Sequence, residues 1–473
     1  MDYRSYSKFV GLDYSLDTFD VNQLAMLRSD NYIYNQVLHA FLKRGGSESW
    51  TASGDIWGIG GYPKEGTTLK TPVHTIPIRH RRDGATSYIE KLNWTTRLWE
   101  IVTQGASTSF DIGAVGLSAR IADTWLLCAG RPAMIRDIDS GDIERLGGPA
   151  PTAAPSVAAS VGAGPLTGTY GYYYTFYDSV TGWESSPSPL SSLVTLTAKD
   201  GELTSLETSA AKEGVDKKRI YRTITTGEQP HLLVDTIALA TASYTDSTTD
   251  DNLGLASDNY DGINGVLRDN HQPPPSSDCY ICAAHENRFW IAQGKNLYYS
   301  EAYDGSSYKL EQFSEDRKFS FPAIITGLAP RRTGGMLVFQ PPGFGIHEIQ
   351  GRSETEFQTV TPFPSEGSSF HTSVSWNNEF VTYWGASGPK LITPGGIVRD
   401  YDDQIKPFLR QILTEEFGSN VFIWSVWHEG SRQFLYGLTA SSASAVIWQD
   451  TDSGAQVGWE DADTGAAIDW EVG

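Results

Sequence analysis

The chain has 473 residues, of which 39% are hydrophobic and 20% charged, and its formal net charge at neutral pH is −21. That length suggests about two to four domains, or one large closed β-architecture, and the composition excludes general disorder. The acidic balance argues against tight, non-specific DNA binding, which depends on neutralisation of phosphates by Lys and Arg.

The chain is rich in glycine and aromatic residues, with 47 Gly, 14 Trp, 23 Tyr and 19 Phe. This composition predicts many short strands joined by tight turns. Three cysteines are too few for a disulfide framework. No apolar run approaches the ~20 residues of a spanning helix, and the N-terminus lacks the apolar stretch of a signal peptide. We therefore expect a soluble chain, made in the cytoplasm, without membrane insertion.

The first part of the chain reads as short strands. Residues 1–50 are expected to form an N-terminal tethering segment with the first strands of a propeller, and residues 51–148 the first main part of that propeller. Within it, two strands flank the turn Arg82-Asp83-Gly84, which is a hairpin signal.

Composition changes at Gly147, where a Gly/Pro-rich linker runs to Pro155. In the tyrosine-rich stretch that follows, apolar residues alternate from Tyr172 to Tyr177, which predicts a half-buried strand. A turn over residues 178–182 and a second strand are expected next, with prolines marking an edge. About seven short strands in roughly 100 residues predict a β-sandwich over residues 149–258.

From residue 259 to 473 the pattern of residues 51–148 returns as strand–turn–strand units. They recur every roughly 45 residues, which is a propeller-blade spacing. One amphipathic helix is predicted, because Ile405, Phe408 and Leu409 begin an i, i+3, i+4 pattern that ends before Gly418. The predicted fold is therefore all-β: a β-propeller of six to eight blades, with an inserted fibronectin/Ig-like β-sandwich and one short amphipathic helix.

Cysteine and histidine form one motif that could bind a metal. Cys279, Cys282 and His285 make a C-x2-C-x2-H pattern, but a zinc site needs four ligands and Cys128 is the only other cysteine. A regular strand would place Cys279 and Cys282 on opposite faces, so buried apolar cysteines are the favoured interpretation and a metal the minor one.

Aspartate-rich turns are the second motif. Asp137 and Asp450 each begin a D-x-D-x-G stretch, which offers oxygens to calcium but lacks the late carboxylate of a calcium loop. Hairpin-tip Asx-turns are the simpler interpretation, and it extends to Asp246, Asp250 and Asp251.

Common catalytic signatures are missing from the sequence, which contains no G-x-S-x-G, H-E-x-x-H or phosphate-loop pattern. Paired carboxylates for glycoside hydrolysis stay open, because their separation is spatial rather than sequential. The prediction is a protein that is not an enzyme, with no catalytic residues, no cofactor and no metal.

Several short stretches resemble known phage proteins. Residues 170–189, with Arg219–Thr223 and Ala242–Asp246, look like the fibronectin-III-like insert common in bacteriophage tail proteins. The N-terminal residues 9–13 and 43–45 resemble the start of the same proteins. Residues 324–328, 337–339 and 347–351 resemble the propeller motif of short-tail needle and nozzle proteins. Residues 447–459 fit the last blade of such proteins.

The resemblance implies a tail nozzle, or tail tube, protein of a short-tailed phage. Such proteins form a homohexameric ring below the portal and its head-to-tail adaptor, carry tail fibres or spikes, and let DNA pass through the lumen. It implies a structural protein of the virion tail, assembled in the host cytoplasm. An acidic lumen would repel DNA, which would slide through without specific binding.

The densest basic cluster is Arg79, Arg81 and Arg82, and Arg331 with Arg332 is the second. Contacts to a neighbouring subunit's carboxylates or to DNA phosphates are one interpretation. A solvated hairpin tip is the other, and the more common one.

Two alternative functions stay open on the sequence. One is a glycan-binding or glycan-hydrolysing propeller that recognises a receptor. The other is a tail hub or baseplate component of a long-tailed phage, which the sequence does not distinguish from a nozzle.

Overall fold

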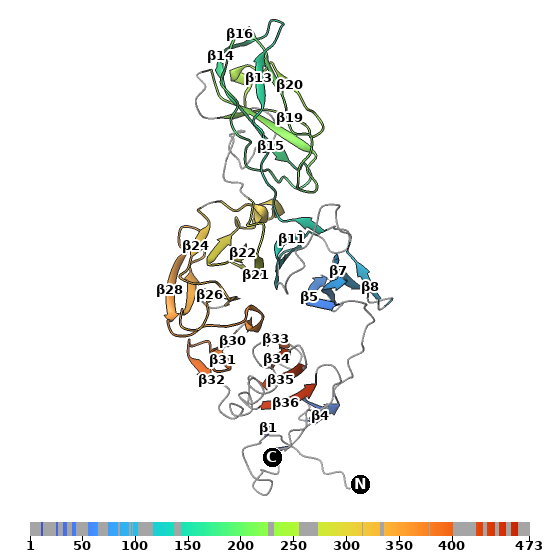
Figure 1. The fold of residues 1–473 in the computed structure, drawn as a ribbon, viewed down its shortest axis with the longest axis vertical. Coiled ribbons are helices and arrows are strands. Elements are labelled where there is room, and N and C mark those ends of the chain that lie inside the picture. The colour runs from blue at the N-terminus through green and yellow to red at the C-terminus, as the bar shows by residue number, and fades with distance from the viewer. Residues whose placement is uncertain are drawn as a thin grey trace. The chain divides into compact units, whose positions relative to one another are not determined.

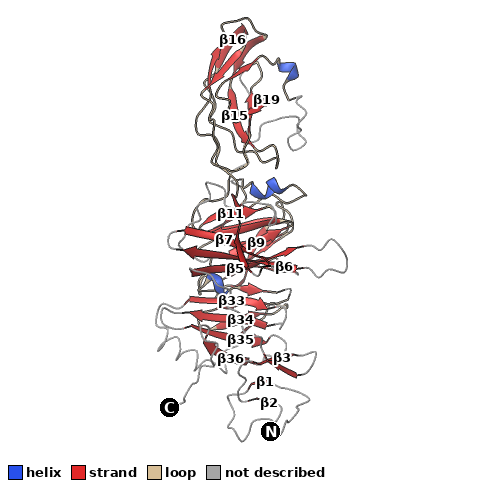
Figure 2. Ribbon diagram, turned by 90° about the vertical axis from the view of Figure 1, so that its right-hand side faces the viewer, coloured by secondary structure: helices blue, strands red, loops and turns tan. Residues whose placement is uncertain are grey.

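The computed structural model describes backbone and side chains for most of residues 89–102, 117–136, 143–225, 231–254 and 273–400, and for scattered residues of 423–436. Further strands are described by their backbone alone. Regular structure in the described part is β-strand apart from three 3-10 helices: η1 (Asp250–Asn252), η3 (Ser307–Glu311) and η4 (His371–Ser373) (Figure 1, Figure 2). The predicted amphipathic helix at residues 405–417 lies outside the described residues.

The chain divides into two compact units, one of residues 52–320 and one that combines residues 1–51 with 321–473. In the second unit, the beginning of the chain completes the last sheet, because Leu12 of β1 pairs antiparallel with Gln456 of β36. The resulting sheet has the order β2-β1-β36-β35-β34-β33. Its strands are β1 (Gly11–Leu12), β2 (Ala25–Met26), β33 (Phe422–His428), β34 (Gln433–Thr439), β35 (Ser444–Asp450) and β36 (Gln456–Asp461). A separate hairpin joins β3 (Tyr32–Asn35) to β4 (Ala40–Lys43).

Small antiparallel sheets of four strands recur along the chain, each in sequence order. This arrangement is consistent with the predicted β-propeller, in which each blade is such a sheet. In residues 52–320 the first such sheet contains β5 (Asp55–Lys64), β6 (His74–Asp83), β7 (Thr86–Asn93) and β8 (Leu98–Ile101). The second contains β9 (Leu117–Ile121), β10 (Thr124–Ala129), β11 (Arg131–Ile135) and β12 (Ile143–Arg145). The third contains β21 (Cys279–His285), β22 (Arg288–Gln293), β23 (Asn296–Tyr299) and β24 (Lys318–Ser320).

In its described residues, the other unit contains two more four-stranded sheets of this kind. They are β25 (Gly327–Pro330), β26 (Met336–Phe339), β27 (Ile346–Gln350) and β28 (Gln358–Phe363), followed by β29 (Ser375–Trp376), β30 (Val381–Trp384), β31 (Pro389–Ile392) and β32 (Val398–Asp400). Their facing sides share one apolar core, in which the rings of Phe339 and Tyr383 lie 5.1 Å apart.

Strand β10 shows why the sheets stack. All six of its residues are buried, as expected of a strand covered on both faces. Trp125 and Leu127 belong to a core shared with the β5–β8 sheet, whereas Leu126 and Cys128 belong to a core shared with the β21–β24 sheet. Because successive side chains of a strand point to opposite faces, one strand supplies two neighbouring cores.

Residues 149–258 contain three short sheets around one aromatic core. Tyr172, Tyr174 and Phe176 of β15 are buried in it, so the predicted apolar face is confirmed. On the other face Tyr173 and Tyr177 are half-buried, but Thr175 is fully buried as well. In the first sheet β17 (Gly201–Thr204) lies between β13 (Ser156–Ala159) and β20 (Tyr244–Asp246), and in the second β14 (Leu166–Tyr170) pairs with β16 (Val194–Lys199). In the third, β18 (Lys217–Arg222) lies between β15 (Tyr172–Tyr177) and β19 (Leu232–Ala238).

The predicted turn at residues 178–182 is present: Asp178 Oδ1 accepts the backbone N–H of Val180 at 2.9 Å, and Gly182 has a φ of 81°. A second strand does not follow it directly. The next segment instead covers the free edge of β15 through serine side chains, so this part of the prediction was wrong.

The covering segment carries a serine at every third position: Ser185, Ser188 and Ser191, all buried. Ser188 donates its backbone N–H to Tyr174 O at 2.9 Å, and its Oγ accepts the N–H of Tyr174 at 3.2 Å. The other two serines repeat this double contact at Tyr172 and Phe176. The backbone N–H and C=O groups along the free edge of β15 are therefore hydrogen-bonded although no strand pairs with this edge.

Candidate functional site

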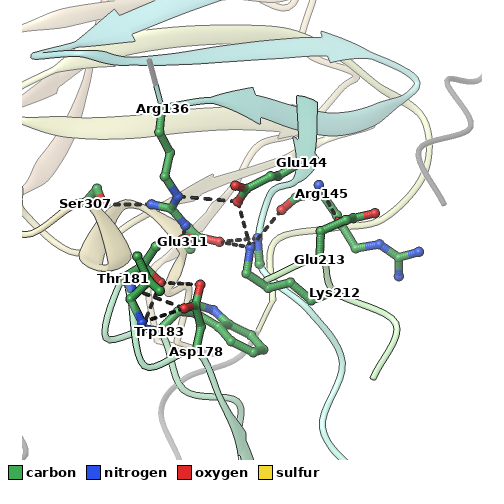
Figure 3. A network of polar contacts seen from close by, with 12 residues as sticks. Arg136, Glu144, Arg145, Asp178, Thr181, Trp183, Lys212, Glu213, Ser307 and Glu311 are labelled. Atoms are coloured by element: carbon green, nitrogen blue, oxygen red, sulfur yellow. Dashed lines mark hydrogen bonds and ion pairs between the residues drawn. The ribbon is translucent and has the colours of Figure 1, made fainter. Parts of the chain in front are cut away.

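Four charged residues from distant parts of the chain meet in one cluster, which we call the joint: Arg136 and Glu144, which are half-buried, and Lys212 and Glu311, which are buried (Figure 3). Arg136 follows β11 and Glu144 lies in β12, whereas Glu311 ends η3. Lys212 comes from the 149–258 segment, between β17 and β18. The joint thus ties that segment to the sheets before and after it in the chain.

Glu311 is at the centre of the joint. One of its oxygens accepts from Arg136 Nη2, and the other lies 2.7 Å from Lys212 Nζ and 3.0 Å from the Gly147 amide N. Glu144 is held more loosely, at 3.3 Å from Arg136 and 3.6 Å from Lys212. Two carboxylates therefore balance two cations.

Neighbouring groups complete the hydrogen bonding around the joint. Arg136 Nη1 donates to Ser307 Oγ at 2.7 Å, and Lys212 Nζ donates to Arg145 O at 3.2 Å. The Arg145 amide donates to Glu213 Oε2 at 3.0 Å, which adds a second link between β12 and the 149–258 segment. Lys212 Nζ also lies 5.3 Å from the ring centroid of Trp183, a cation–π contact.

Burial decides the electrostatics of the joint. The Glu311 side chain is 0% exposed and that of Lys212 is 1% exposed. Burial alone would raise the pKa of Glu311, but the charges of Arg136 and Lys212 outweigh it and hold that pKa below its ordinary value. Burial raises the pKa of Glu144, which its looser ion pairs only partly offset. Glu311 is thus ionised at neutral pH, and its removal would take from the buried Lys212 its nearest carboxylate.

A second buried network lies inside the 149–258 segment. Glu184 accepts from Arg219 at 2.9 Å, from Tyr221 OH at 2.7 Å and from Thr175 Oγ1 at 2.6 Å. The Glu184 side chain is 1% exposed and that of Arg219 is 3% exposed. A tyrosine, a glutamate and an arginine also occur together in the active sites of enzymes that hydrolyse glycosides. Here the three side chains lie in a packed core and hydrogen-bond to one another, so we interpret the network as structural.

A third network explains two of the aspartates. Asp246 lies 3.4 Å from Arg222 Nη1, accepts from Tyr172 OH at 2.9 Å and accepts the Thr248 amide at 2.9 Å. Asp250 accepts from Arg222 Nη2 at 2.9 Å. The Asx-turn predicted at Asp246 is therefore present, together with an ion pair that the sequence did not indicate.

The remaining aspartate motifs are only partly visible. Residues 137–142 lie outside the described residues, and Asp450 is the last residue of β35, a strand described by its backbone. Among the residues with described side chains, no group of three or more His, Cys, Asp or Glu side chains could hold a metal ion.

The three cysteines lie in one apolar core and are free thiols. The prediction that Cys279 and Cys282 lie on opposite faces was wrong. Strand β21 has a bulge, because Cys279 pairs with Gln293 but Ile281 pairs with Ala292, which leaves Tyr280 as the extra residue. One extra residue reverses the alternation and turns both thiols to the same side. Burial raises the pKa of Cys279 to about 12, which keeps the thiol protonated.

The predicted basic clusters have different surroundings. Arg79, Arg81 and Arg82 lie within β6, not in the turn, because Asp83 still pairs with Thr86 of β7. This corrects the predicted position of the turn, and the side chains of the three arginines are outside the described residues. Arg331 forms an ion pair with Glu348 of β27 in its own sheet. Arg332 lies outside the described residues.

Sequence reasoning missed every member of the joint. A signal was present at Glu311, which is a charged residue between the buried Leu310 and Phe313. Charged residues at such positions are almost never fully buried unless they are paired. The sequence does not name the partner, since Arg136 and Glu311 are 175 positions apart.

No protein-family model matches the chain, and no curated protein matches it. Solved structures similar to it include an oligogalacturonate lyase in complex with manganese (9% identity, TM-score 0.24, covering 62% of this chain and 74% of that one). Also similar is a protein from Lactobacillus plantarum, with 11% identity and a TM-score of 0.29 over 79% of this chain and 91% of that one. Hydrazine synthase from Kuenenia stuttgartiensis is similar with 11% identity and a TM-score of 0.24 over 81% of this chain and 41% of that one. At such low TM-scores the likeness is distant, and the fold assignment rests on the chain's own sheets. In the described part of the chain, no helix has the length and apolar character needed to cross a membrane.

Proposed function

We propose that the chain is a structural protein of the virion, the tail nozzle ring of a short-tailed bacteriophage. It is a β-propeller with a fibronectin-III-like β-sandwich inserted at residues 149–258. The motifs at residues 170–189, 324–328 and 347–351 support this assignment by their resemblance to phage tail proteins. The recurring four-stranded sheets support it independently of those motifs.

The observation that carries the proposal is the way the chain leaves and re-enters its stack of sheets. Gly130 and Cys279 exchange backbone hydrogen bonds of 2.9 and 2.7 Å, which join the β9–β12 sheet to the start of the β21–β24 sheet. The two sheets also share an apolar core. Adjacent sheets are thus continuous in packing although the 149–258 segment separates them in sequence. An insertion between two blades produces this arrangement.

The polar chemistry of the described residues supports a mechanical role. The joint and the two networks of the 149–258 segment are buried, and their members bond to one another. Such networks fix positions of strands and segments. We propose that the protein works by shape, as a homohexameric ring that binds the head-to-tail adaptor and carries fibres or spikes.

Charge supports the transport part of the proposal. With a net charge of −21 per chain, a ring of several copies would present DNA with a surface of its own sign. DNA would then pass without adsorbing, because non-specific binding needs Lys and Arg at the phosphates. Arg79, Arg81 and Arg82 are proposed to face a neighbouring subunit or DNA phosphates.

Negative-stain microscopy of the purified chain, with mass determination in solution, tests this function. We expect rings with a central hole and the mass of a closed homo-oligomer. A monomer that cleaves or binds a glycan would overturn the proposal in favour of a receptor-recognising propeller. A ring located in the baseplate of a long-tailed particle would overturn the nozzle assignment.

A further inference from the structure

We infer that the 149–258 segment is a rigid arm, locked by the joint to the sheets on either side of it in the chain, and that Glu311 is the residue on which this lock depends. A Gly/Pro-rich connection by itself predicts a flexible tether. The inference is independent of the proposed function, since it concerns only contacts within residues 52–320.

The contacts of Glu311 come from separate parts of the chain. Glu311 belongs to η3 beyond the β21–β23 strands, Arg136 to the end of β11, and Lys212 to the 149–258 segment. With the Gly147 amide, one carboxylate therefore holds several pieces of chain at once (Figure 3). Any rotation of the segment about its connections would separate Lys212 from Glu311 in a region that excludes solvent.

The connection between β12 and the arm is itself fixed. Gly147 is buried, has a φ of 64° and donates its amide to Glu311. A Cβ there would lie 2.8 Å from Pro274 Cδ and 3.0 Å from Glu311 O, so the chain passes closely under η3. Further along, Glu207 Oε1 accepts the amides of Thr152 at 2.6 Å and Ala153 at 2.9 Å. The predicted linker is thus hydrogen-bonded at both ends.

Aromatic packing removes the remaining freedom at the joint. A Cβ on Gly148 would lie 2.7 Å from Lys212 Cβ and 3.1 Å from Trp183. Trp183 is 1% exposed and belongs to the core of the 149–258 segment. The connecting chain therefore lies against the arm's own core, so the arm has no free pivot at this point.

The test measures distances between two spin labels in the full-length chain, one on the arm at Val161→Cys and one on the β22–β23 turn at Lys295→Cys. Both positions are exposed, whereas the native thiols are buried and stay unlabelled. We expect a single narrow distance distribution in the parent chain. Glu311→Gln and, separately, Lys212→Met should broaden it.

Amide hydrogen exchange supplies a second readout at the joint itself. The Gly147 and Arg145 amides bond to Glu311 and Glu213, so both are protected while the joint is closed. In Glu311→Gln we expect their exchange to accelerate by about two to three orders of magnitude, the range that corresponds to breaking a buried pair. Exchange within β15 should be unchanged, which shows that the arm is still folded.

The matched control is Asp304→Asn, which removes an exposed ion pair with Lys309 close to the same 3-10 helix. It should leave both readouts at the parent values. A broad distribution in the parent chain would overturn the inference. So would a narrow one in both joint variants with unchanged Gly147 exchange, or an Asp304→Asn effect equal to that of Glu311→Gln.

Discussion

The 149–258 segment and the sheets that flank it are both β-structure, but they are held together by different forces. The β9–β12 and β21–β24 sheets share a core of apolar side chains and thiols, in which Leu126 and Phe289 are 0% exposed. The core of the 149–258 segment is aromatic and is crossed by buried ion pairs at Glu184–Arg219 and Arg222–Asp246. Burial of apolar surface stabilises both regions, and the second region also depends on each buried charge keeping its partner.

The two regions should therefore respond differently to amino-acid substitutions in their cores. Apolar packing degrades gradually, because a smaller side chain loses contacts in proportion to its size. A buried ion pair fails abruptly when one partner is removed, since the other charge stays in a low-dielectric core. The joint combines both regions and should behave like the ion pairs.

The largest effect is expected for Glu184→Ala in the 149–258 segment. The change removes the carboxylate partner of Arg219 and the acceptor of Tyr221 and Thr175, which should cost about 3–5 kcal/mol. Hydrogen exchange of the β18 amides measures the loss. Glu202→Ala, on an exposed position of β17, is the control and should change little. If the free energy of unfolding fell by less than about 1 kcal/mol, the core would not depend on the Glu184–Arg219 pair, which would contradict the prediction.

A slightly smaller effect is expected for Leu126→Ala in the sheet core. Leu126 is fully buried between two sheets, so its truncation should cost about 3 kcal/mol and loosen β10 and β22 together. Exchange rates of both strands provide the measurement, with Ser118→Ala on the exposed side of β9 as the control. If only β10 loosened, the two sheets would not share a core.

Ser188→Ala tests the serine edge of β15. The Tyr174 amide would lose its acceptor in a buried position, at a cost of about 1–2 kcal/mol. The neighbouring Ser192 is exposed, so Ser192→Ala is the matched control. We expect faster exchange at Tyr174 in the first variant alone. Equal rates in both would show that water replaces the hydroxyl.

Acidification should weaken the joint through Glu311. Its pKa is lower in the folded chain than in the unfolded one, so its stabilisation is complete above the ordinary glutamate value and is lost as pH falls through the folded value. Between the two values, Gly147 protection should fall by up to about tenfold per pH unit. Glu144 acts in the opposite direction, because burial raises its pKa, and it takes up its proton at a higher pH.

Protection factors of Gly147, corrected for intrinsic exchange, follow this titration. The other charged groups that face Glu311 and Glu144 are Arg136, Lys212 and, more remotely, Asp178. In Glu311→Gln the loss of Gly147 protection on acidification should disappear, because Glu144 acts in the opposite direction. If it persisted unchanged, another group would be responsible.

The smallest effect is expected from metals. Because the three thiols are free and buried in an apolar core, neither added zinc nor a chelator should shift the thermal unfolding midpoint. A midpoint that rises with zinc would show a metal site and would contradict the apolar interpretation of these cysteines.

Local patterns in the sequence predicted the strands well. The strand predicted at Tyr172–Tyr177 appears in the structure with its apolar face buried, because side-chain period is a property of neighbouring residues. The same local reasoning failed at Cys279 and Cys282. A single bulge changes which face of the sheet the following side chains point to, and this bulge arises from the pairing register of β21 with β22.

Sequence alone was thus enough to predict that the chain is built of short strands and that the cysteines are buried in apolar surroundings. The folded structure was needed to show which charges meet and what covers the edge of β15. Arg136 and Glu311 are 175 positions apart, and their contact exists only once three pieces of chain have folded together. A buried charge must find its partner in space, and no local pattern carries that information.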